Sequence, residues 1–199
     1  MIRWLSFLSL FLFSYQAQST QLLILGDSLS AGYQMPIEKA WPSLLSETLQ
    51  QHNKAVAVIN GSISGDTTGN GLARLPSLLK QYAPNYVLIE LGANDGLRGF
   101  PPHIPEQNLI KIIDLISQSG ASPLLMQIRI PPNYGQRYSQ AFFDIYPRIS
   151  TTKQVPLIPF FVEEVIRRPE WMRQDGLHPN EAAQPWIANW VATQLAPLL

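Results

Sequence analysis

The chain contains no cysteine, which excludes disulfide bonds, thiolate metal sites, a cysteine nucleophile and a lipidated N-terminal cysteine. Charge is also scarce: 14% of the 199 residues are charged, and the formal net charge is +0 at pH 7. No run or stripe of Lys and Arg resembles the clusters that bind phosphate backbones or anionic lipid. We therefore expect no nucleic-acid partner.

The N-terminal apolar run is too short to cross a membrane. A positive start at Arg3 is followed by an uncharged, largely apolar run over residues 4–15. As a helix this run would be about 18 Å long, whereas the hydrocarbon core of a bilayer is about 30 Å thick. Ala17 and Ser19 place small residues where a signal peptidase requires them. We predict a cleaved signal peptide over 1–19, a periplasmic or secreted location and no stable membrane anchor.

From residue 20 onward, short apolar runs alternate with longer segments of helix-like spacing. This alternation predicts βαβ units and a parallel sheet whose strands are covered on both faces. The expected strands are 21–25, 55–60, 86–91, 123–128 and 156–158. The expected helices are 41–51, 71–81, 106–119, 137–153 and 185–195. Pro76 predicts a kink or a late start in the second helix.

No internal repeat, low-complexity tract or linker interrupts residues 20–199, so we predict one domain. Its fold class is α/β, a doubly wound, flavodoxin-like sheet of five mostly parallel strands flanked by helices, with strand order 2-1-3-4-5. We expect the domain to be a monomer.

Small and polar residues follow the first three expected strands, at the edge where open parallel sheets bind ligands. They are Gly26-Asp27-Ser28-Leu29-Ser30, Ser62-Ile63-Ser64-Gly65-Asp66 and Gly92-Ala93-Asn94-Asp95. In a 2-1-3 order these loops are neighbours, and Ser28, in a tight turn after a buried strand, can expose its hydroxyl. The second residue after Ser28 is Ser30, so the G-x-S-x-G nucleophile elbow is absent.

A serine nucleophile needs a base, normally histidine, and the chain has three. His52 lies in a polar helix end and is expected to be solvated, and His103 has only Glu106 as a nearby carboxylate. Asp175 precedes His178 by three residues across a glycine, so their side chains can meet on one short loop. The carboxylate would then fix the tautomer that leaves one ring nitrogen free to take a serine proton. The alternative is that Asp175 caps the last helix.

Acyl transfer also requires hydrogen-bond donors aimed at the developing oxyanion. Three candidates are available: the N–H of Ser28, the N–H of Gly65 and the side-chain amide of Asn94. Taken singly, Gly65 and Asn94 are equally consistent with ordinary turn residues. The combination favours a catalytic site, because four separate segments each supply a suitable residue.

These four segments resemble the blocks of the SGNH (GDSL-type) hydrolases, in the same order and spacing over nearly all of 20–199. Wider strings are similar to a subgroup of Gram-negative periplasmic thioesterases and lysophospholipases: Gly26-Asp27-Ser28-Leu29-Ser30-Ala31-Gly32-Tyr33, Leu72-Ala73-Arg74-Leu75-Pro76 and Asn94-Asp95-Gly96-Leu97-Arg98-Gly99. The resemblance implies Ser28 as nucleophile, His178 as base and then acid, and Asp175 as its orienting partner. It implies an oxyanion hole of Ser28, Gly65 and Asn94, and no metal or organic cofactor.

The expected substrates are small acyl esters and thioesters: acyl-CoA thioesters, lysophospholipids and simple esters. The segment 96–105 supports this, because Leu97, Phe100 and Ile104 suit a flap over an acyl chain. The alternative is a surface loop folded onto the third helix. Two rival functions stay open: a carbohydrate O-acetyl esterase with the same catalytic set, and a non-catalytic flavodoxin-like phosphate binder.

Overall fold

The computed structural model describes residues 20–199, and the predicted signal peptide with its cleavage site lies outside these residues. Five strands form one parallel sheet in the order β2-β1-β3-β4-β5. They are β1 Thr20–Gly26, β2 Val56–Asn60, β3 Tyr86–Glu90, β4 Ser122–Met126 and β5 Leu157–Ile158. The predicted fold class and strand order are therefore confirmed.

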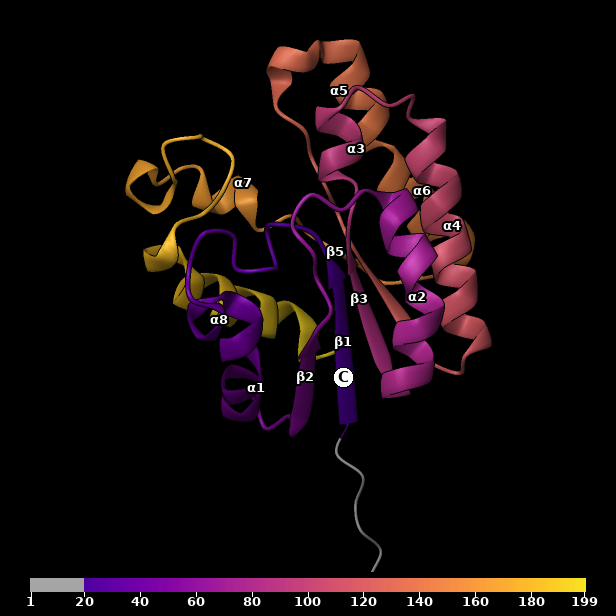
Figure 1. Cartoon of the computed structure of the whole chain (residues 1–199), viewed down its shortest axis with the longest axis vertical. Coiled ribbons are helices and arrows are strands. Elements are labelled where there is room, and N and C mark those ends of the chain that lie inside the picture. The colour runs from indigo at the N-terminus through magenta and orange to yellow at the C-terminus, as the bar shows by residue number, and fades with distance from the viewer. Residues whose placement is uncertain (1–19) are drawn as a thin grey trace, which may run out of the picture.

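Helices cover both faces of this sheet (Figure 1). They are α1 Trp41–Gln51, α2 Thr68–Tyr82, α3 Ala93–Leu97, α4 His103–Gln118, α5 Gln136–Phe143, α6 Ile145–Lys153, α7 Val162–Val165 and α8 Gln184–Leu195. Four 3-10 turns complete the described chain: η1 Ile37–Lys39, η2 Pro132–Tyr134, η3 Pro169–Trp171 and η4 Glu181–Ala183. The pair α1 and α8 packs on one face, and α2, α4 and α6 pack on the other.

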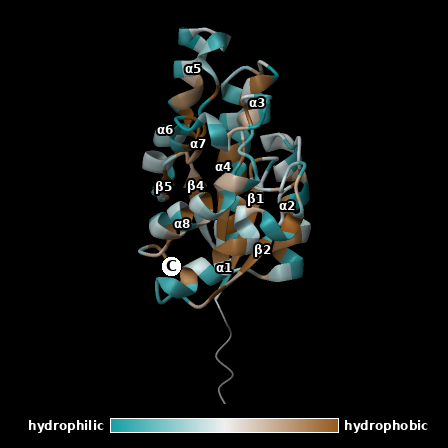
Figure 2. Ribbon diagram, turned by 90° about the vertical axis from the view of Figure 1, so that its left-hand side faces the viewer, coloured by the Kyte–Doolittle hydropathy of each residue, from teal (hydrophilic) through white to brown (hydrophobic). Residues whose placement is uncertain are grey.

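The core lies on both sides of the central strands, which explains their unbroken apolar sequence. Leu22, Leu23, Ile24 and Leu25 of β1 are all fully buried. Figure 2 shows the same pattern, with hydrophobic strands inside and hydrophilic residues on the outer faces of the helices. Burying each such side chain stabilises the fold by roughly 1.5–3 kcal/mol. Within residues 20–199, no helix is both long enough and apolar enough to span a bilayer.

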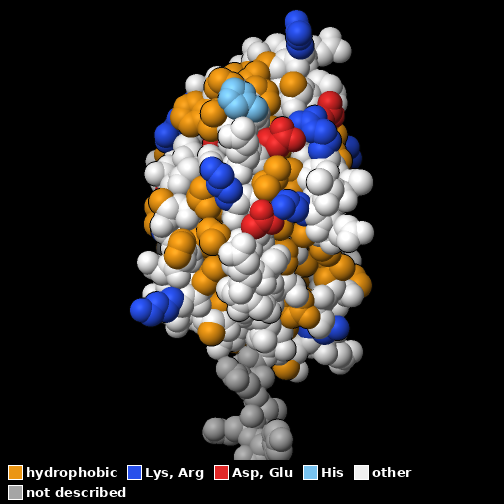
Figure 3. Space-filling model, turned by 90° about the vertical axis from the view of Figure 1, so that its right-hand side faces the viewer, with side chains coloured by type: hydrophobic (Ala, Val, Ile, Leu, Met, Phe, Trp, Pro, Cys, Tyr) orange, Lys and Arg blue, Asp and Glu red, His pale blue; other side chains and the backbone are white. Residues whose placement is uncertain are grey.

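The surface over α2 and α4 carries acidic and basic side chains interspersed, as Figure 3 shows for that face. Several charges pair across elements, including Arg148 with Glu106 at 3.0 Å and Lys153 with Asp114 at 2.6 Å. This face therefore offers no concentrated field of one sign to an anionic polymer.

The single helix expected over 137–153 is two helices, α5 and α6, which meet at Asp144. Pro147 explains the break, because a proline has no N–H for the carbonyl four residues earlier and its ring crowds that carbonyl. The freed carbonyl is that of Phe143, and the side-chain amide of Gln127 donates to it at 3.0 Å. The expectation of one continuous helix was wrong for this local reason.

The second helix does not start late. It begins at Thr68, after a capping box in which Thr67 and Asn70 satisfy each other's backbone N–H groups, and it continues through Pro76. The carboxylate of Asp95 accepts hydrogen bonds from the Thr68 N–H at 2.8 Å and its hydroxyl at 2.6 Å. These contacts stabilise the first turn ahead of the proline. The kink at Pro76 stays a prediction.

Half of the segment 96–105 belongs to helices, which corrects the continuous loop expected there. Gly96 is buried inside α3, and α4 begins at His103, so only 98–102 connect the two helices. The hydroxyl of Tyr138 on α5 donates to the carbonyl of Phe100 at 2.7 Å and ties the connection to the domain. The flap expected over 96–105 is therefore reduced to a short link, 98–102, that is hydrogen-bonded to α5.

Candidate active site

The turn that carries Ser28 follows β1 directly and is closed by its own backbone. The N–H groups of Ser30 and Ala31 donate to the carbonyl of Asp27 at 3.2 and 2.9 Å. The N–H of Leu29 donates to the Asp27 carboxylate at 3.0 Å. Because this turn sits at the carboxyl end of a central strand, it leaves the half-buried Ser28 side chain at the sheet edge.

Glycine is required immediately before this turn. A Cβ at Gly26 would lie 2.8 Å from the Oε2 of Glu90 and 2.8 Å from the Oγ of Ser62, closer than real contacts. Ser30 also donates to Glu90, at 2.7 Å. The strand end and the turn are therefore packed against polar side chains with no space between them.

Ser28, His178 and Asp175 lie in one hydrogen-bonded line. The Oγ of Ser28 is 2.9 Å from the Nε2 of His178. The Nδ1 of His178 is 2.7 Å from the Oδ2 of Asp175. With the ring proton on Nδ1 donated to the carboxylate, Nε2 is free to accept the serine hydroxyl hydrogen. The structure thus brings together the three residues that the sequence singled out.

A short hairpin carries Asp175 and His178. Met172 and Pro179 form an antiparallel bridge at its base, and the N–H of Arg173 donates to the carbonyl of His178 at 2.8 Å. Gly176 has φ +66 at the tip, a left-handed conformation that glycine adopts without strain. The hairpin turns the carboxylate and the imidazole toward each other.

Asp175 does not cap the last helix. Asn180 is the N-cap of η4 and accepts from the N–H of Ala182 at 3.0 Å. Partial burial acts to raise the pKa of Asp175, but hydrogen bonds from the N–H groups of His178 and Leu177 and from the His178 ring outweigh it, and lower this pKa to about 2. Asp175 is therefore a carboxylate at neutral pH.

The residues expected to form the oxyanion hole, Ser28, Gly65 and Asn94, line one groove together with His178. Within residues 20–199, the N–H groups of Ser28 and Gly65 take part in no hydrogen bond, so both are free to donate. Gly65 has φ +86, and the guanidinium of Arg98 donates to its carbonyl at 2.9 Å. The side-chain amide of Asn94 donates to the Asp66 carbonyl at 2.9 Å and to the Asp27 carboxylate at 3.2 Å.

A layer of buried carboxyl groups supports these loops from below. Asp27, Glu90 and Asp95 are all fully buried. Burial raises the pKa of Asp27 to about 7, and it raises the pKa of Glu90 and that of Asp95 as well. One oxygen of Glu90 has no hydrogen-bond partner among the described residues, nor has the Oγ of Ser62. Glu90 gave no signal in the sequence, because its environment is made by residues distant along the chain.

A groove of about 820 Å³ opens beside Ser28, within the range typical of small-molecule sites. Away from the triad its wall is largely apolar, with side chains including Leu29, Leu97, Ile130, Phe160, Val162 and Ile166. Leu97 was expected in the substrate site; among the described residues that line the groove, Phe100 and Ile104 are absent. The far wall comes from 129–134 and 160–167, which sequence reasoning missed.

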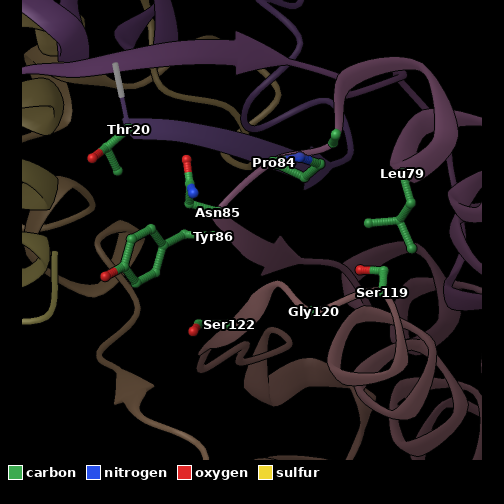
Figure 4. A pocket seen from close by; sticks show the side chains of 9 residues that line it. Thr20, Leu79, Pro84, Asn85, Tyr86, Ser119, Gly120 and Ser122 are labelled. Atoms are coloured by element: carbon green, nitrogen blue, oxygen red, sulfur yellow. The ribbon is translucent and has the colours of Figure 1, made fainter. Parts of the chain in front are cut away.

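A second cavity, of about 520 Å³, lies at the opposite end of the sheet (Figure 4). Its wall includes Thr20, Asn85 and Ser122, which lie at or before the amino ends of β1, β3 and β4. Ligands of open parallel sheets bind at the carboxyl ends, so this cavity lies on the wrong edge for the site. The groove beside Ser28 is the candidate active site.

A serine hydroxyl, an imidazole and a carboxylate aligned at the carboxyl edge of a parallel α/β sheet define a serine hydrolase. The chain order is serine, aspartate, histidine, and the last two share one hairpin. This hairpin and the missing G-x-S-x-G turn set the site apart from the common α/β-hydrolase pattern.

Comparison with known proteins agrees with this class. The GDSL-like Lipase/Acylhydrolase family matches residues 24–184, and the chain belongs to this family. It is 64% identical to the arylesterase of Vibrio mimicus over 98% of both chains. It is 55% identical to the thioesterase 1/protease 1/lysophospholipase L1 of Escherichia coli, over 99% of this chain and 94% of that one.

Solved structures show the same relationship. The psychrotrophic esterase EstA from Pseudoalteromonas sp. superposes with a TM-score of 0.87 at 42% identity, covering 90% of this chain and 98% of that one. The protein is therefore an ester hydrolase of the SGNH type, as the sequence predicted.

Proposed function

We propose that the chain hydrolyses acyl esters and thioesters through an acyl-enzyme formed on Ser28. The Oγ of Ser28 attacks the carbonyl carbon while its proton passes to the Nε2 of His178, 2.9 Å away. The tetrahedral intermediate collapses, the bond to the leaving oxygen or sulfur breaks, and His178 returns the proton to that atom. Water repeats the sequence on the acyl-enzyme, releases the acid and restores the Ser28 hydroxyl.

Asp175 and the free donors stabilise the charges that form in these steps. The carboxylate of Asp175 holds the Nδ1 proton at 2.7 Å and stabilises the imidazolium. Among residues 20–199, the N–H groups of Ser28 and Gly65 donate to no other group. They therefore bond to the oxyanion without first breaking a hydrogen bond. Asn94 supplies a third donor by giving up its longer bond, at 3.2 Å to Asp27.

The apolar groove is the observation that favours acyl chains as the substrate. A volume of about 820 Å³ beside Ser28 accommodates a chain of several methylenes, and Leu97, Ile130 and Phe160 offer apolar contact. The relatives' names, arylesterase and thioesterase 1/protease 1/lysophospholipase L1, also describe acyl esters and thioesters. We assign acyl-CoA thioesters, lysophospholipids and simple esters as the substrate class.

The assignment of Ser28 is tested by labelling with a fluorophosphonate and mapping the modified peptide. We expect label on Ser28 alone, its loss in Ser28→Ala, and a fall in kcat of several orders of magnitude with the fold intact. Ser64→Ala is the matched control, because Ser64 lines the same groove and should leave the label in place. Label on another serine would refute the proposal.

The substrate class is tested with p-nitrophenyl esters, acyl-CoAs and lysophospholipids of graded chain length. A rise in kcat/KM with acyl length supports acyl hydrolysis. A preference for acetyl esters without any rise would support the carbohydrate O-acetyl esterase instead. The phosphate binder predicts no hydrolysis, and the turn after β1 argues against it, since the N–H groups of Leu29, Ser30 and Ala31 already bond to Asp27.

Export remains part of the proposal. The sequence of 1–19 supports a signal peptide cut after Ser19 and release into the periplasm or medium. N-terminal sequencing of the protein from osmotic-shock fluid and from medium tests this, and an intact Met1 in the cytoplasmic fraction would contradict it.

A further inference from the structure

Tyr33 lies against the imidazole of His178. The two rings have centroids 4.3 Å apart and planes inclined by 30°, so the tyrosine ring covers one side of the imidazole. Tyr33 is half-buried in the loop between β1 and η1, the same loop that carries Ser28. His178 comes from the hairpin near the other end of the chain. The contact therefore joins the two segments that supply the nucleophile and the base.

A polar chain reinforces this contact. The side-chain amide of Gln34 donates to the hydroxyl of Tyr33 at 3.1 Å, and its carbonyl oxygen accepts from the guanidinium of Arg173. Arg173 also lies 6.0 Å from the centroid of the Tyr33 ring. Gln34 has φ +52, a conformation that few non-glycine residues adopt and that surrounding contacts must hold. We call Gln34 and Arg173, the two residues that hold the Tyr33 side chain, the clasp.

We propose that Tyr33, held by the clasp, is a positioning residue for the hydrolytic reaction: it fixes the plane of the His178 ring so that Nε2 faces the Oγ of Ser28, and it stabilises the imidazolium. This inference rests on the proposed function. Tyr33 acts through His178.

The physical reason is a difference between the two charge states of the ring. Neutral imidazole gains only packing contact from the tyrosine ring, whereas imidazolium is also attracted to its π face. Imidazolium forms as Ser28 attacks, so the added attraction belongs to the transition state and raises kcat. Fixing the ring plane acts in the same direction, since small displacements of a base slow proton transfer.

The test compares Tyr33→Leu, which removes the aromatic face, with Tyr33→Phe, which keeps it and removes only the hydroxyl. Tyr33→Leu should lower kcat by about tenfold, equal to about 1.4 kcal/mol, with KM within about twofold of wild type. Tyr33→Phe should retain at least about half of kcat. Tyr82→Leu is the control, because Tyr82 is also half-buried but ends α2 at the opposite edge of the sheet.

Activity is expressed per site titrated with the fluorophosphonate, so that misfolded protein does not count as slow enzyme. In NMR spectra the His178 ring protons should be displaced by the Tyr33 ring current, and the displacement should vanish in Tyr33→Leu and persist in Tyr33→Phe. Should Tyr33→Leu fail to fold, Tyr33→Met, which fills similar space without an aromatic face, takes its place and should lower kcat by a similar factor.

Three results would overturn the proposal: unchanged kcat per site in Tyr33→Leu, an equal loss in Tyr33→Phe, or a loss confined to KM. If Tyr33→Leu does not fold, unchanged kcat per site in Tyr33→Met overturns it. Failure of the proposed function is distinguishable, because it would appear as wild-type protein without fluorophosphonate label on Ser28.

Discussion

The two halves of the active site are built in opposite ways. Ser28 and Gly65 stand on loops after β1 and β2, and Asn94 stands in α3, just after β3. Fully buried carboxyl groups, those of Asp27 and Asp95, adjoin Ser28 and Asn94 in the chain. Asp175 and His178 stand on a hairpin at the surface, where the Asp175 side chain is 36% exposed. The positions of the donors and the nucleophile therefore follow from the sheet and its core, whereas the base is held by its own hairpin and by the ring of Tyr33.

The pKa values of the carboxyl groups also differ between the two halves of the site. Burial raises the pKa of Asp27 to about 7, because it outweighs the hydrogen bonds from Leu29 and Asn94 that lower this pKa. Asp175 is only partly buried, and local hydrogen bonds lower its pKa to about 2. The pKa values of carboxyl groups in one site are thus shifted in opposite directions. The charged Asp175 stabilises a positive imidazolium, whereas the buried carboxyl groups support the loops.

The largest expected effect on kcat comes from a substitution in the exposed half of the site, at Asp175. Asp175→Asn should lower kcat by about 10⁴, because the amide favours the tautomer with its proton on Nε2. The fold should survive, since Asp175 bonds only within its own hairpin among residues 20–199. Steady-state kinetics with a matched thermal melt measure both. A loss of kcat below about tenfold would show that Asp175 only shapes the turn and has no role in the reaction.

Next in size is Asn94 in the buried half. Asn94→Ala should reduce kcat by roughly 10² to 10³ with KM little changed, because the bond to the oxyanion matures in the transition state. Asn94→Asp is the matched variant, of similar size but without the donor, and should be at least as damaging. An effect on KM alone would identify Asn94 as a substrate-binding residue.

The third effect concerns stability and pH. The pKa of Asp27 is about 7 in the fold against its ordinary value of 3.8, so between these values the folded protein holds a proton that the unfolded chain releases. Stability should fall as pH rises through this window. Asp27→Asn removes this titration and should flatten the dependence. Urea unfolding at about pH 4 and about pH 7 measures it. A slope equal to wild type would contradict the burial argument.

The stability contributed by Asp175 should depend on pH in the direction opposite to that of Asp27. The pKa of Asp175 in the fold, about 2, lies below its ordinary value of 3.8. The stability it contributes is present above the ordinary value and is lost as pH falls through the folded value. Asp175→Asn should therefore change the stability at neutral pH but not its slope between about pH 5 and about pH 7.

The smallest expected effect concerns the dependence of kcat/KM on acyl chain length, which tests the groove beside Ser28. Each methylene buried there adds at most about 0.8 kcal/mol, or roughly fourfold in kcat/KM. Leu97→Ser should reduce this gain for long acyl chains and leave acetyl esters nearly unchanged. Phe100→Ser is the control, since the groove wall within 20–199 includes Leu97 but not Phe100. Equal losses in both variants would place the acyl chain elsewhere.

Local patterns sufficed to predict the strands and the site loops. Each strand is a continuous apolar run, and each site loop directly follows one, so the topology alone brings Ser28 near Gly65 and Asn94. Asp175 and His178 were predictable because they lie only three positions apart in the sequence. These features depend on neighbours in the sequence or on the order of parallel strands.

Features made by distant residues were not predictable in this way. The sequence does not reveal that Arg98 bonds to the Gly65 carbonyl, or that Tyr33 covers His178. The far wall of the groove, including Ile130 and Phe160, is assembled only when the segments after β4 and β5 fold over the sheet edge. The break at Pro147 was readable in principle and was outweighed by the helix-like spacing around it.

The hairpin that carries the base has one further consequence, for how the enzyme loses activity. Apart from the contacts of His178 with Tyr33 and Ser28, the hairpin is closed by the Met172–Pro179 bridge and a few hydrogen bonds, whereas β1 is enclosed in the core. Opening such a segment requires less free energy than unfolding the domain. On warming, His178 should leave Ser28 while the sheet is still intact, and cooling should restore the site without refolding. The temperature limit of this enzyme is then a property of one hairpin, separate from the melting of its fold.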